Sequence, residues 1–294
     1  MAAIAESLDH PFMLRPGTRD DAGACGRICY EAFGAIAEKH SFPPDFPSAE
    51  VATELLSGLL THPGFYSVIA EAEGRIVGSN FLDERNAIAG IGPITVAPHT
   101  QNQAAGRRLM ADVLNRVADK GFPGVRLLQA TYHNRSLALY TRLGFVAREP
   151  LSTLQGPPPG VELPGHRVRP ATRADLPHCN RLCIRVHGHD RDGELSEAID
   201  RGTARVVEHA GRIVGYTTLV AFFGHSVGES NDALKALIAA ADECPGPGFH
   251  VPTRNVELFR WCLENGLRVV QPMTLMSIGL YNEPAGAYLP SIFY

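Results

Sequence analysis

The chain has 294 residues, more than a single domain of ordinary size, so its length favours two domains. Apolar residues make up 45% and charged residues 20%, which is typical of globular proteins, and a net charge of −4 offers no basic surface for nucleic acid. No apolar stretch approaches the ~20 residues that cross a bilayer, and the start lacks the basic region of a secretory signal, so we expect a cytoplasmic protein without a membrane partner.

Alternating and helical apolar patterns predict the elements of the first half of the chain. In chain order they are strand 12–16, helix 20–38, helix 48–60, strand 66–72, strand 75–83, strand 88–96, helix 104–119, strand 125–131, helix 135–142 and strand 145–148. A Gly74-Arg75 turn between two alternating runs marks a hairpin. Helices that alternate with the later strands predict the α/β class, with a mixed sheet and helices on both faces.

The most informative of these segments is Gly92–Met110, a strand–loop–helix joint. Its apolar run stops before Pro98, and a polar loop then opens into a helix that starts with the small residues Ala104, Ala105 and Gly106. The first amides of a helix lack intrahelical partners and point along the positive end of its dipole. Small side chains let a diphosphate approach those amides, so the joint predicts a phosphate site.

The segment Leu127–Phe145 has a second informative pattern: strand, turn, short helix, glycine stop and strand. Asn134 suits the start of the helix as a cap, and Gly144 suits its left-handed end. Tyr140 falls inside this helix.

Together the two segments resemble the GNAT acyltransferases, the Gcn5-related N-acetyltransferases. The first is similar to the family's acyl-CoA pyrophosphate loop and reads Val96-x-Pro98-x-x-Gln101-x-x-Ala104-x-Gly106, with alanine where the first glycine is usual. The second is similar to the family's other cofactor motif and reads Asn134…Leu139-Tyr140-x-x-Leu143-Gly144-Phe145. The resemblance covers nearly all of residues 12–150. It implies an N-acetyltransferase that moves an acetyl group from acetyl-CoA to a primary amine.

The resemblance also implies where the coenzyme lies. The start of the helix would hold the pyrophosphate, a backbone amide at Val96 would face the thioester oxygen, and Asn134 would reach the pantetheine arm or an ordered water. The implied coenzyme-binding residues are Ile94, Thr95, Val96, Gln101, Asn102, Gln103, Ala104, Ala105, Gly106, Arg107, Asn134 and Tyr140.

Tyr140 occupies the family's usual general-acid position. A phenol with a pKa near ~10 is protonated at neutral pH and can donate to the leaving thiolate. Its alternative role is to pack the helix onto the sheet. The base that takes the proton of the amine is predicted to be Glu31 or Glu84, and each of these carboxylates is equally compatible with a solvated surface role. Further choices for the base are Asp83, His62 and His133.

Internal echoes indicate that the second half is a copy of the first. Arg15–Ala22 recurs as Arg169–Leu176, Gly74–Gly78 recurs as Gly211–Gly215, and the spacing of Asn134 and Tyr140 recurs in Asn255 and Trp261. The second copy lacks the phosphate loop and the counterpart of His40–Pro47, a Pro/Phe-rich segment that we expect to border a substrate cleft. Because the indole of Trp261 does not ionise usefully, we expect this copy to be catalytically silent.

These echoes predict three parts of the chain. The first is an N-terminal GNAT domain over 1–152, the second a Pro/Gly linker over 153–165, and the third a degenerate GNAT-like domain over 166–294. The apolar tail Tyr281–Tyr294 should not remain exposed, so we expect it to pack across the domain junction or in a homodimer, where the second copy would complete the acceptor cleft or add interface area.

The six cysteines predict neither a disulfide nor a zinc site. Cys25/Cys29 and Cys179/Cys183 each lie four residues apart in helical patterns, which favours buried helix faces. His187-Gly188-His189-Asp190 has the look of a metal site but lacks a third ligand at a suitable spacing, so we expect no metal.

Two other kinds of function stay open. A CoA-binding regulator without catalysis is compatible with Ala104 and with the unassigned base, and a structural or interaction protein could keep two relic copies. The acceptor stays open among a small amine, an aminoglycoside, an amino acid, a peptide N-terminus and a thiol-carrier precursor, and we expect an unidentified small molecule.

Overall fold

The structure is a computed structural model that describes residues 12–100 and 104–294. The first half contains β1 (Met13–Pro16), α1 (Ala22–Lys39), α2 (Ala49–Thr61), β2 (Phe65–Ala72), β3 (Arg75–Asp83), β4 (Ala89–Ile91), β5 (Thr95–Val96), α3 (Ala105–Asp119), β6 (Gly124–Ala130), α4 (Asn134–Arg142) and β7 (Val146–Gln155). The second half contains β8 (His166–Pro170), α5 (Leu176–His187), α6 (Asp192–Asp200), β9 (Arg205–His209), β10 (Arg212–Thr217), β11 (Ser226–Gly228), α7 (Asn231–Ala239), β12 (Phe249–Pro252), α8 (Val256–Glu264), β13 (Arg268–Gly279) and β14 (Ala287–Leu289).

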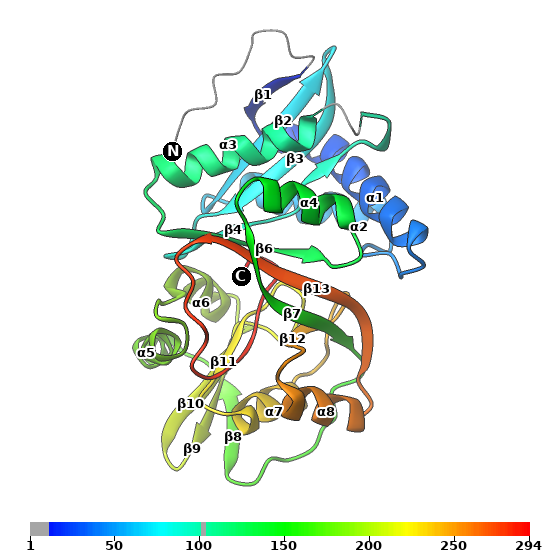
Figure 1. Cartoon of the computed structure of the whole chain (residues 1–294). Coiled ribbons are helices and arrows are strands. Elements are labelled where there is room, and N and C mark those ends of the chain that lie inside the picture. Colours follow the sequence, from blue (N-terminus) through cyan, green and yellow to red (C-terminus); the bar gives the residue numbers. More distant parts are fainter. Residues whose placement is uncertain (1–11, 101–103) are drawn as a thin grey trace.

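The predicted mixed α/β class is confirmed. Most neighbouring strands run antiparallel, β4 and β6 run parallel, and helices cover both faces of the larger sheet (Figure 1). The hairpin between β2 and β3 turns at Glu73-Gly74, both in the left-handed region, and α4 ends at Gly144 with a φ of 98°. Among the described residues, no helix is long and apolar enough to cross a bilayer.

The predicted strand 88–96 is wrong, because this segment forms two short strands that pair differently. β4 pairs with both β3 and β6, whereas β5 pairs with β3. The break falls at Gly92-Pro93, where a side chain at Gly92 would collide with the ring of Phe293 and where Pro93 has no N–H to donate to a neighbouring strand. Pairing between β4 and β6 ends at Gly90 and Arg126, so β5 and β6 diverge beyond that point.

The two halves exchange their last strands. The larger sheet has the order β1-β2-β3-β4-β6-β13-β7-β12, and the smaller sheet has the order β14-β11-β10-β9-β8. β13 of the second half therefore lies between β6 and β7 of the first, and β7 lies between β13 and β12 (Figure 1). β7 continues to Gln155, so residues 153–155 of the predicted linker belong to a strand.

Both halves contain the same polar arrangement at the start of their first helices. Arg15 donates to both carboxylate oxygens of Asp21 at 2.8 and 2.7 Å, and Arg169 donates to both oxygens of Asp175 at 2.8 Å each. These hydrogen bonds lower the pKa of Asp21 to about 2 and lower that of Asp175 further. The repeated arrangement supports the duplication that the sequence suggests.

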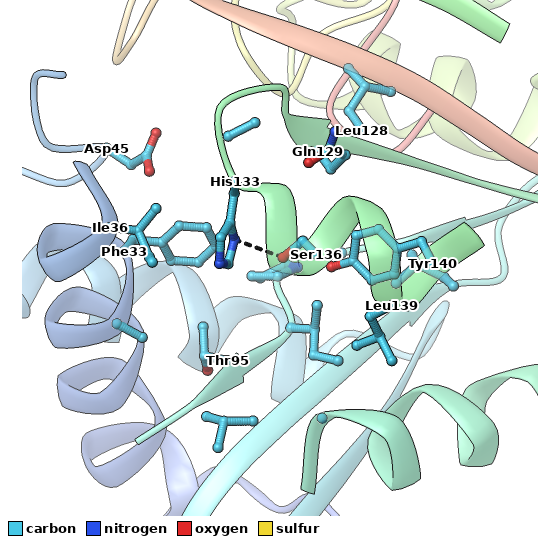
Figure 2. Close-up of a pocket in the computed structure, with 18 of the residues that line it drawn as sticks. Phe33, Ile36, Asp45, Thr95, Leu128, Gln129, His133, Ser136, Leu139 and Tyr140 are labelled. Carbon is cyan, nitrogen blue, oxygen red and sulfur yellow. Dashed lines mark hydrogen bonds between the residues drawn. The ribbon is translucent and has the colours of Figure 1, made fainter. Parts of the chain in front are cut away.

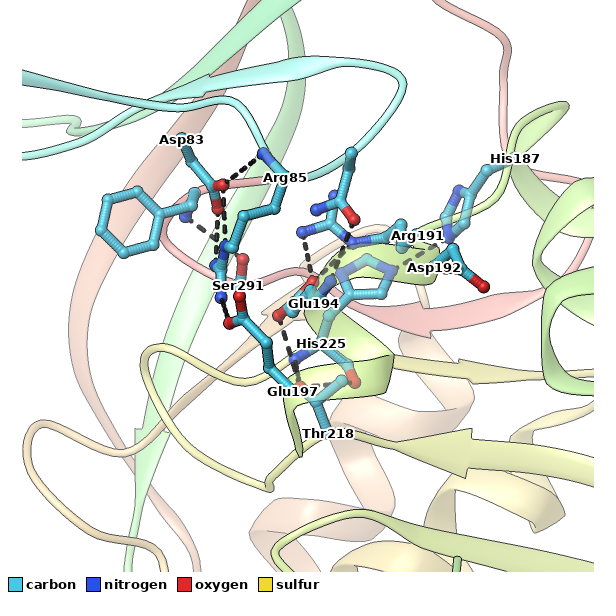
Figure 3. A network of polar contacts seen from close by, with 12 residues as sticks. Asp83, Arg85, His187, Arg191, Asp192, Glu194, Glu197, Thr218, His225 and Ser291 are labelled. Carbon is cyan, nitrogen blue, oxygen red and sulfur yellow. Dashed lines mark hydrogen bonds and ion pairs between the residues drawn. The ribbon is translucent and has the colours of Figure 1, made fainter. Parts of the chain in front are cut away.

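Polar contacts and the C-terminal tail join the two halves (Figure 3). Arg85 forms ion pairs of 2.6 Å with Asp83 of its own half and with Glu197 on α6 of the second half. The ring of Phe293 packs against Phe65 with 5.3 Å between centroids. The tail therefore packs across the junction, as predicted.

The six cysteine side chains are buried and their thiols are free. Cys25 and Cys29 face the core between α1 and α2, and Cys179 and Cys183 belong to a separate core cluster under α5. Both pairs lie on the buried helix faces that their spacing predicts.

Candidate functional site

A cavity of about 380 Å³ opens where β5 and β6 diverge (Figure 2). Its volume lies in the range of small-molecule sites. Its lining comes from β5, the start of α3, the end of β6 and the start of α4, together with α1 and the segment that follows it. The second half contributes residues of β13, of the segment between β10 and β11, and of the tail.

The cavity reaches from one face of the sheet to the other. Successive side chains of a strand point to opposite faces, so Gln129 lies on one face and Leu128 and Ala130 lie on the other. Leu127, on the same face as Gln129, packs in one cluster with Tyr140 of α4. Leu128 and Ala130 pack instead with Met273 of β13. We call the side toward α3 and α4 the coenzyme side and the opposite side the acceptor side.

On the coenzyme side, the first turn of α3 faces the cavity. Ala105, Gly106 and Arg107 all line it, and no described residue accepts a hydrogen bond from their backbone N–H groups. These N–H groups have no acceptor within the helix either, and the helix dipole adds partial positive charge at this end. The turn is therefore arranged to bind an anion.

Ala104 precedes this turn in the left-handed region, with a φ of 68°. A residue with a Cβ atom is strained there by ~1–2 kcal/mol, which explains why glycine is usual at this place of the motif. The alanine changes backbone strain at the loop and leaves the N–H groups of α3 in place.

Most of the predicted coenzyme-binding residues share the wall of the cavity. Those that line it are Ile94, Thr95, Val96, Ala104, Ala105, Gly106, Arg107 and Tyr140. The predicted residues Gln101, Asn102 and Gln103 lie outside the described residues.

The structure does not place Asn134 as predicted. Asn134 is exposed, does not line the cavity, and is the first helical residue of α4, so it is not the cap. His133 is the capping residue, and its Nδ1 lies 2.7 Å from the hydroxyl of Ser136. The chain turns one residue earlier than the pattern suggests because the N–H of Asn134 donates to the carbonyl of Tyr132.

Tyr140 is buried in the core cluster between α4 and the sheet and also lines the cavity. Its ring packs edge-on against Phe145, with 6.0 Å between centroids. Desolvation raises the pKa of Tyr140 to about 12, against the opposing effect of a hydrogen bond with Ser136. The phenol is therefore protonated at neutral pH, and packing and proton donation are compatible in this side chain.

Of the predicted bases, His133 lies on the cavity wall, and Glu31 and Glu84 do not. Glu31 is exposed on α1. Both carboxylate oxygens of Glu84 accept hydrogen bonds from Arg116, at 2.6 and 2.9 Å. The structure thus corrects the choice of Glu31 and Glu84, because neither carboxylate faces the cavity.

The remaining candidates belong to the junction between the halves. Asp83 is buried against Arg85, and His62 lies 3.1 Å from Glu197.

Desolvation and nearby cations lower the pKa of His133, so its imidazole is neutral at pH 7. Figure 2 shows His133 and Ser136 between Asp45 on one side and Tyr140 on the other.

Polar residues of the cavity that were missing from the prediction include Asp45, Gln129 and Gln271. Asp45 lies in the Pro/Phe-rich segment His40–Pro47, which borders the cavity as predicted and which carried the signal for it. Gln129 is 4% exposed, and neither polar atom of its side chain has a hydrogen-bond partner among the described residues. Gln271 comes from the second half, and no local pattern pointed to it.

The side chains of His187 and His189 are both buried, and Figure 3 shows His187 in the polar network between the halves. His187 Nδ1 is 2.8 Å from the hydroxyl of Tyr294, and its Nε2 is 3.3 Å from Nε2 of His225. Burial lowers the pKa of His187 and of His225 well below the ordinary value. Within residues 12–100 and 104–294, no group of three His, Cys, Asp or Glu side chains could hold a metal ion.

Comparisons with known proteins agree with this geometry. The profile of the Acetyltransferase (GNAT) family matches residues 34–145, which include the first turn of α3, β6 and α4. A search of curated proteins returned no match.

Solved structures share the fold over nearly the whole chain. A putative acetyltransferase from Pyrococcus horikoshii has a TM-score of 0.72 at 16% identity, with 96% of each chain covered. A GCN5-related N-acetyltransferase from Sphaerobacter thermophilus has a TM-score of 0.62 at 16% identity, with 94% of this chain and 98% of that chain covered. A GCN5-related N-acetyltransferase from Anabaena variabilis has a TM-score of 0.54 at 14% identity, covering 90% and 72%. Residues 34–145 thus match the Acetyltransferase (GNAT) family, and solved acetyltransferase structures share the fold over most of the chain.

Proposed function

We propose that this protein is an N-acetyltransferase that moves an acetyl group from acetyl-CoA to a primary amine of a small molecule, with one working site in the first half. The observation that carries the proposal is a single cavity that joins the first-turn amides of α3, which have no acceptor among the described residues, to the buried phenol of Tyr140. The family match over residues 34–145 supports the same activity.

The coenzyme side suits each part of acetyl-CoA. The diphosphate would bind at the N–H groups of Ala105, Gly106 and Arg107. The pantetheine arm would run between β5 and β6, whose facing edges do not pair with each other. Its amides would supply the hydrogen-bond partners that the buried side chain of Gln129 lacks among the described residues.

The reaction needs two proton transfers. The nitrogen of the neutral amine attacks the thioester carbon and forms a C–N bond, and the C–S bond then breaks. The amine proton passes to a base, for which His133 is our choice because its neutral imidazole lines the cavity. The departing thiolate takes the proton of Tyr140.

An assay of thiol release from acetyl-CoA with a panel of primary amines tests this function. We expect amine-dependent release of CoA and a rise in thermal stability on adding acetyl-CoA, equivalent to ~2.7 kcal/mol at a hundred times the dissociation constant. Binding without turnover would identify a CoA-dependent regulator instead. An unchanged melting temperature would identify a structural protein with relic GNAT copies.

The proposal extends to the setting of the enzyme. We propose a cytoplasmic enzyme that acts on small molecules rather than on nucleic acid, since the net charge is −4 and the six thiols are free.

A further inference from the structure

Aromatic rings from both halves form the acceptor side of the cavity. Phe33 and Phe46 come from α1 and the segment after it, and Phe222 and Phe223 come from the segment between β10 and β11. The ring of Phe223 is 38% exposed and packs against Phe293 with 5.6 Å between centroids. The second half therefore supplies part of the surface that an acceptor would touch.

Asp45 is the one carboxylate among the described residues that line the cavity. Its Oδ1 accepts a hydrogen bond of 3.1 Å from Nε2 of Gln271, and Oε1 of Gln271 accepts a bond of 3.2 Å from the hydroxyl of Tyr132. Oδ2 of Asp45 accepts no hydrogen bond from any described residue. The carboxylate is thus held in place from the second half and retains one oxygen for a ligand.

The segment that carries Asp45 is fixed by a further contact. Phe42 stacks on Tyr132, with 4.1 Å between centroids and an angle of 10° between the rings. Tyr132 therefore supports Asp45 twice, through this stack and through Gln271. Such a fixed carboxylate binds a cation without first having to be ordered.

The surroundings of Asp45 select the chemistry of its ligand. Burial raises the pKa of this carboxyl group, and the hydrogen bond from Gln271 opposes that rise. Among the described residues, no Lys, Arg or His side chain donates a hydrogen bond to Asp45. An ammonium group would provide a cationic partner. The rings of Phe222 and Phe223 line the same cavity and favour an apolar body in the acceptor, because polar groups that face them would lose their hydrogen bonds to water.

We infer that the acceptor is a primary amine with a single positive charge and an aromatic or branched apolar body, whose ammonium pairs with Asp45 while its body packs on Phe222 and Phe223. The inference rests on the proposed acetyl transfer. Asp45 receives the ammonium form as the acceptor enters. The ammonium then loses one proton to solvent water, and the neutral amine attacks the thioester and passes its next proton to His133. The second half of the protein then forms part of the acceptor-binding surface and determines which amines fit the site of the first half.

The charge of Asp45 is tested with two probes of the same shape, 2-phenylethylamine and its neutral analogue 2-phenylethanol. The test compares Asp45→Asn with Glu38→Gln, which removes the same charge from an exposed position on α1 outside the cavity lining. We expect Asp45→Asn to raise KM for the amine roughly tenfold or more, as is typical for the loss of a charged hydrogen bond. Inhibition by 2-phenylethanol and the dissociation constant of CoA should not change, and Glu38→Gln should behave as wild type.

The aromatic wall is tested with Phe223→Ala and its control Leu219→Ala. Leu219 lies in the same segment with a similar exposed fraction of 36% and does not line the cavity. We expect Phe223→Ala to raise KM for 2-phenylethylamine roughly three- to tenfold and to change KM for ethylamine little, because ethylamine has no ring to lose contact. Leu219→Ala should leave both KM values as in wild type.

The outcomes separate the inference from the proposed function. Turnover of ethanolamine or glycine with a kcat/KM at or above that of 2-phenylethylamine would overturn the acceptor class and leave acetyl transfer standing. An unchanged KM in Asp45→Asn would overturn the role of Asp45. If acetyl-CoA neither binds nor turns over, the proposed function fails. Calorimetric binding of 2-phenylethylamine to wild type and to Asp45→Asn then decides the inference: it is supported if only wild type binds and overturned otherwise.

Discussion

Tyr140 joins two roles that are often separate, since its ring belongs to the core and its hydroxyl belongs to the cavity. With a pKa raised to about 12, the phenol stays protonated at neutral pH and can donate its proton to the thiolate that develops as the C–S bond breaks. Packing of the helix onto the sheet was one of the two roles expected of Tyr140 from the sequence, and the motif position selected the residue.

Replacing Tyr140 with phenylalanine removes the proton donor and keeps the ring. We expect kcat to fall by ~10²-fold or more, as is usual for the loss of a general acid, while the dissociation constant of CoA stays within about twofold. Stopped-flow thiol release and calorimetric titration with CoA measure the two quantities. A variant with full kcat would show that Tyr140 serves packing alone.

At the scale of elements, the first turn of α3 and the gap between β5 and β6 define the coenzyme side. Local patterns in the sequence predicted α3, β6 and α4 within a few residues, because each follows from apolar spacing and a glycine or small-residue boundary. They did not predict the break at Gly92-Pro93, since it depends on Phe293, which approaches from far along the chain. Asp45, Gln271 and Phe222 also come together from distant parts of the chain, and local sequence patterns do not predict such long-range contacts.

A charge placed in the first turn of α3 tests the coenzyme site directly. A side chain at Gly106 meets only ordinary contacts, 3.7 Å from Val96 and 3.9 Å from Leu139, and a glutamate suits the start of a helix. We expect Gly106→Glu to weaken CoA binding by roughly tenfold or more through repulsion of the diphosphate, with thermal stability retained. Fluorescence or calorimetric titration measures the affinity.

Gly58→Glu is the matched control, because Gly58 is exposed on α2 and a side chain there meets nothing within 4 Å. It should bind CoA as wild type does. Equal affinities in both variants would mean that the diphosphate binds elsewhere.

At the scale of the whole molecule, the exchanged strands make the two halves one cooperative unit. β13 hydrogen-bonds to β6 on one side and to β7 on the other, so neither half can unfold without breaking the sheet of its neighbour. The internal repeat predicted two copies of one fold. It did not predict that the copies exchange strands, because the sequence pattern of a strand is the same whether it pairs within its own half or with the other half.

This interleaving predicts a single unfolding transition. Differential scanning calorimetry should show one peak, with the calorimetric and van't Hoff enthalpies in agreement. Two separate peaks, one for each half, would contradict the shared sheet.

Buried histidines make stability depend on pH. Burial lowers the pKa of His189 and of His250 to about 4 and lowers those of His187 and His225 further, against ~6.5 in the unfolded chain. The unfolded state therefore binds more protons below pH 6.5, and stability falls as the pH drops from 6.5 toward 4.

His189 and His250 should each lower the free energy of unfolding by about 2 kcal/mol at pH 5 relative to its value above pH 7. Urea denaturation at pH 7.5, 6 and 5 measures the change. A midpoint that stays constant over this range would show that these imidazoles bind protons in the native protein as they do in the unfolded chain.

The place of β13 in the larger sheet also sets an order of events during synthesis. The ribosome releases β6 and β7 long before β13, so a nascent chain presents one edge of β6 without its final neighbour. Gln271, which holds Asp45, arrives with that late strand. The part of the cavity that would determine substrate specificity is thus completed last, after the second half has been translated.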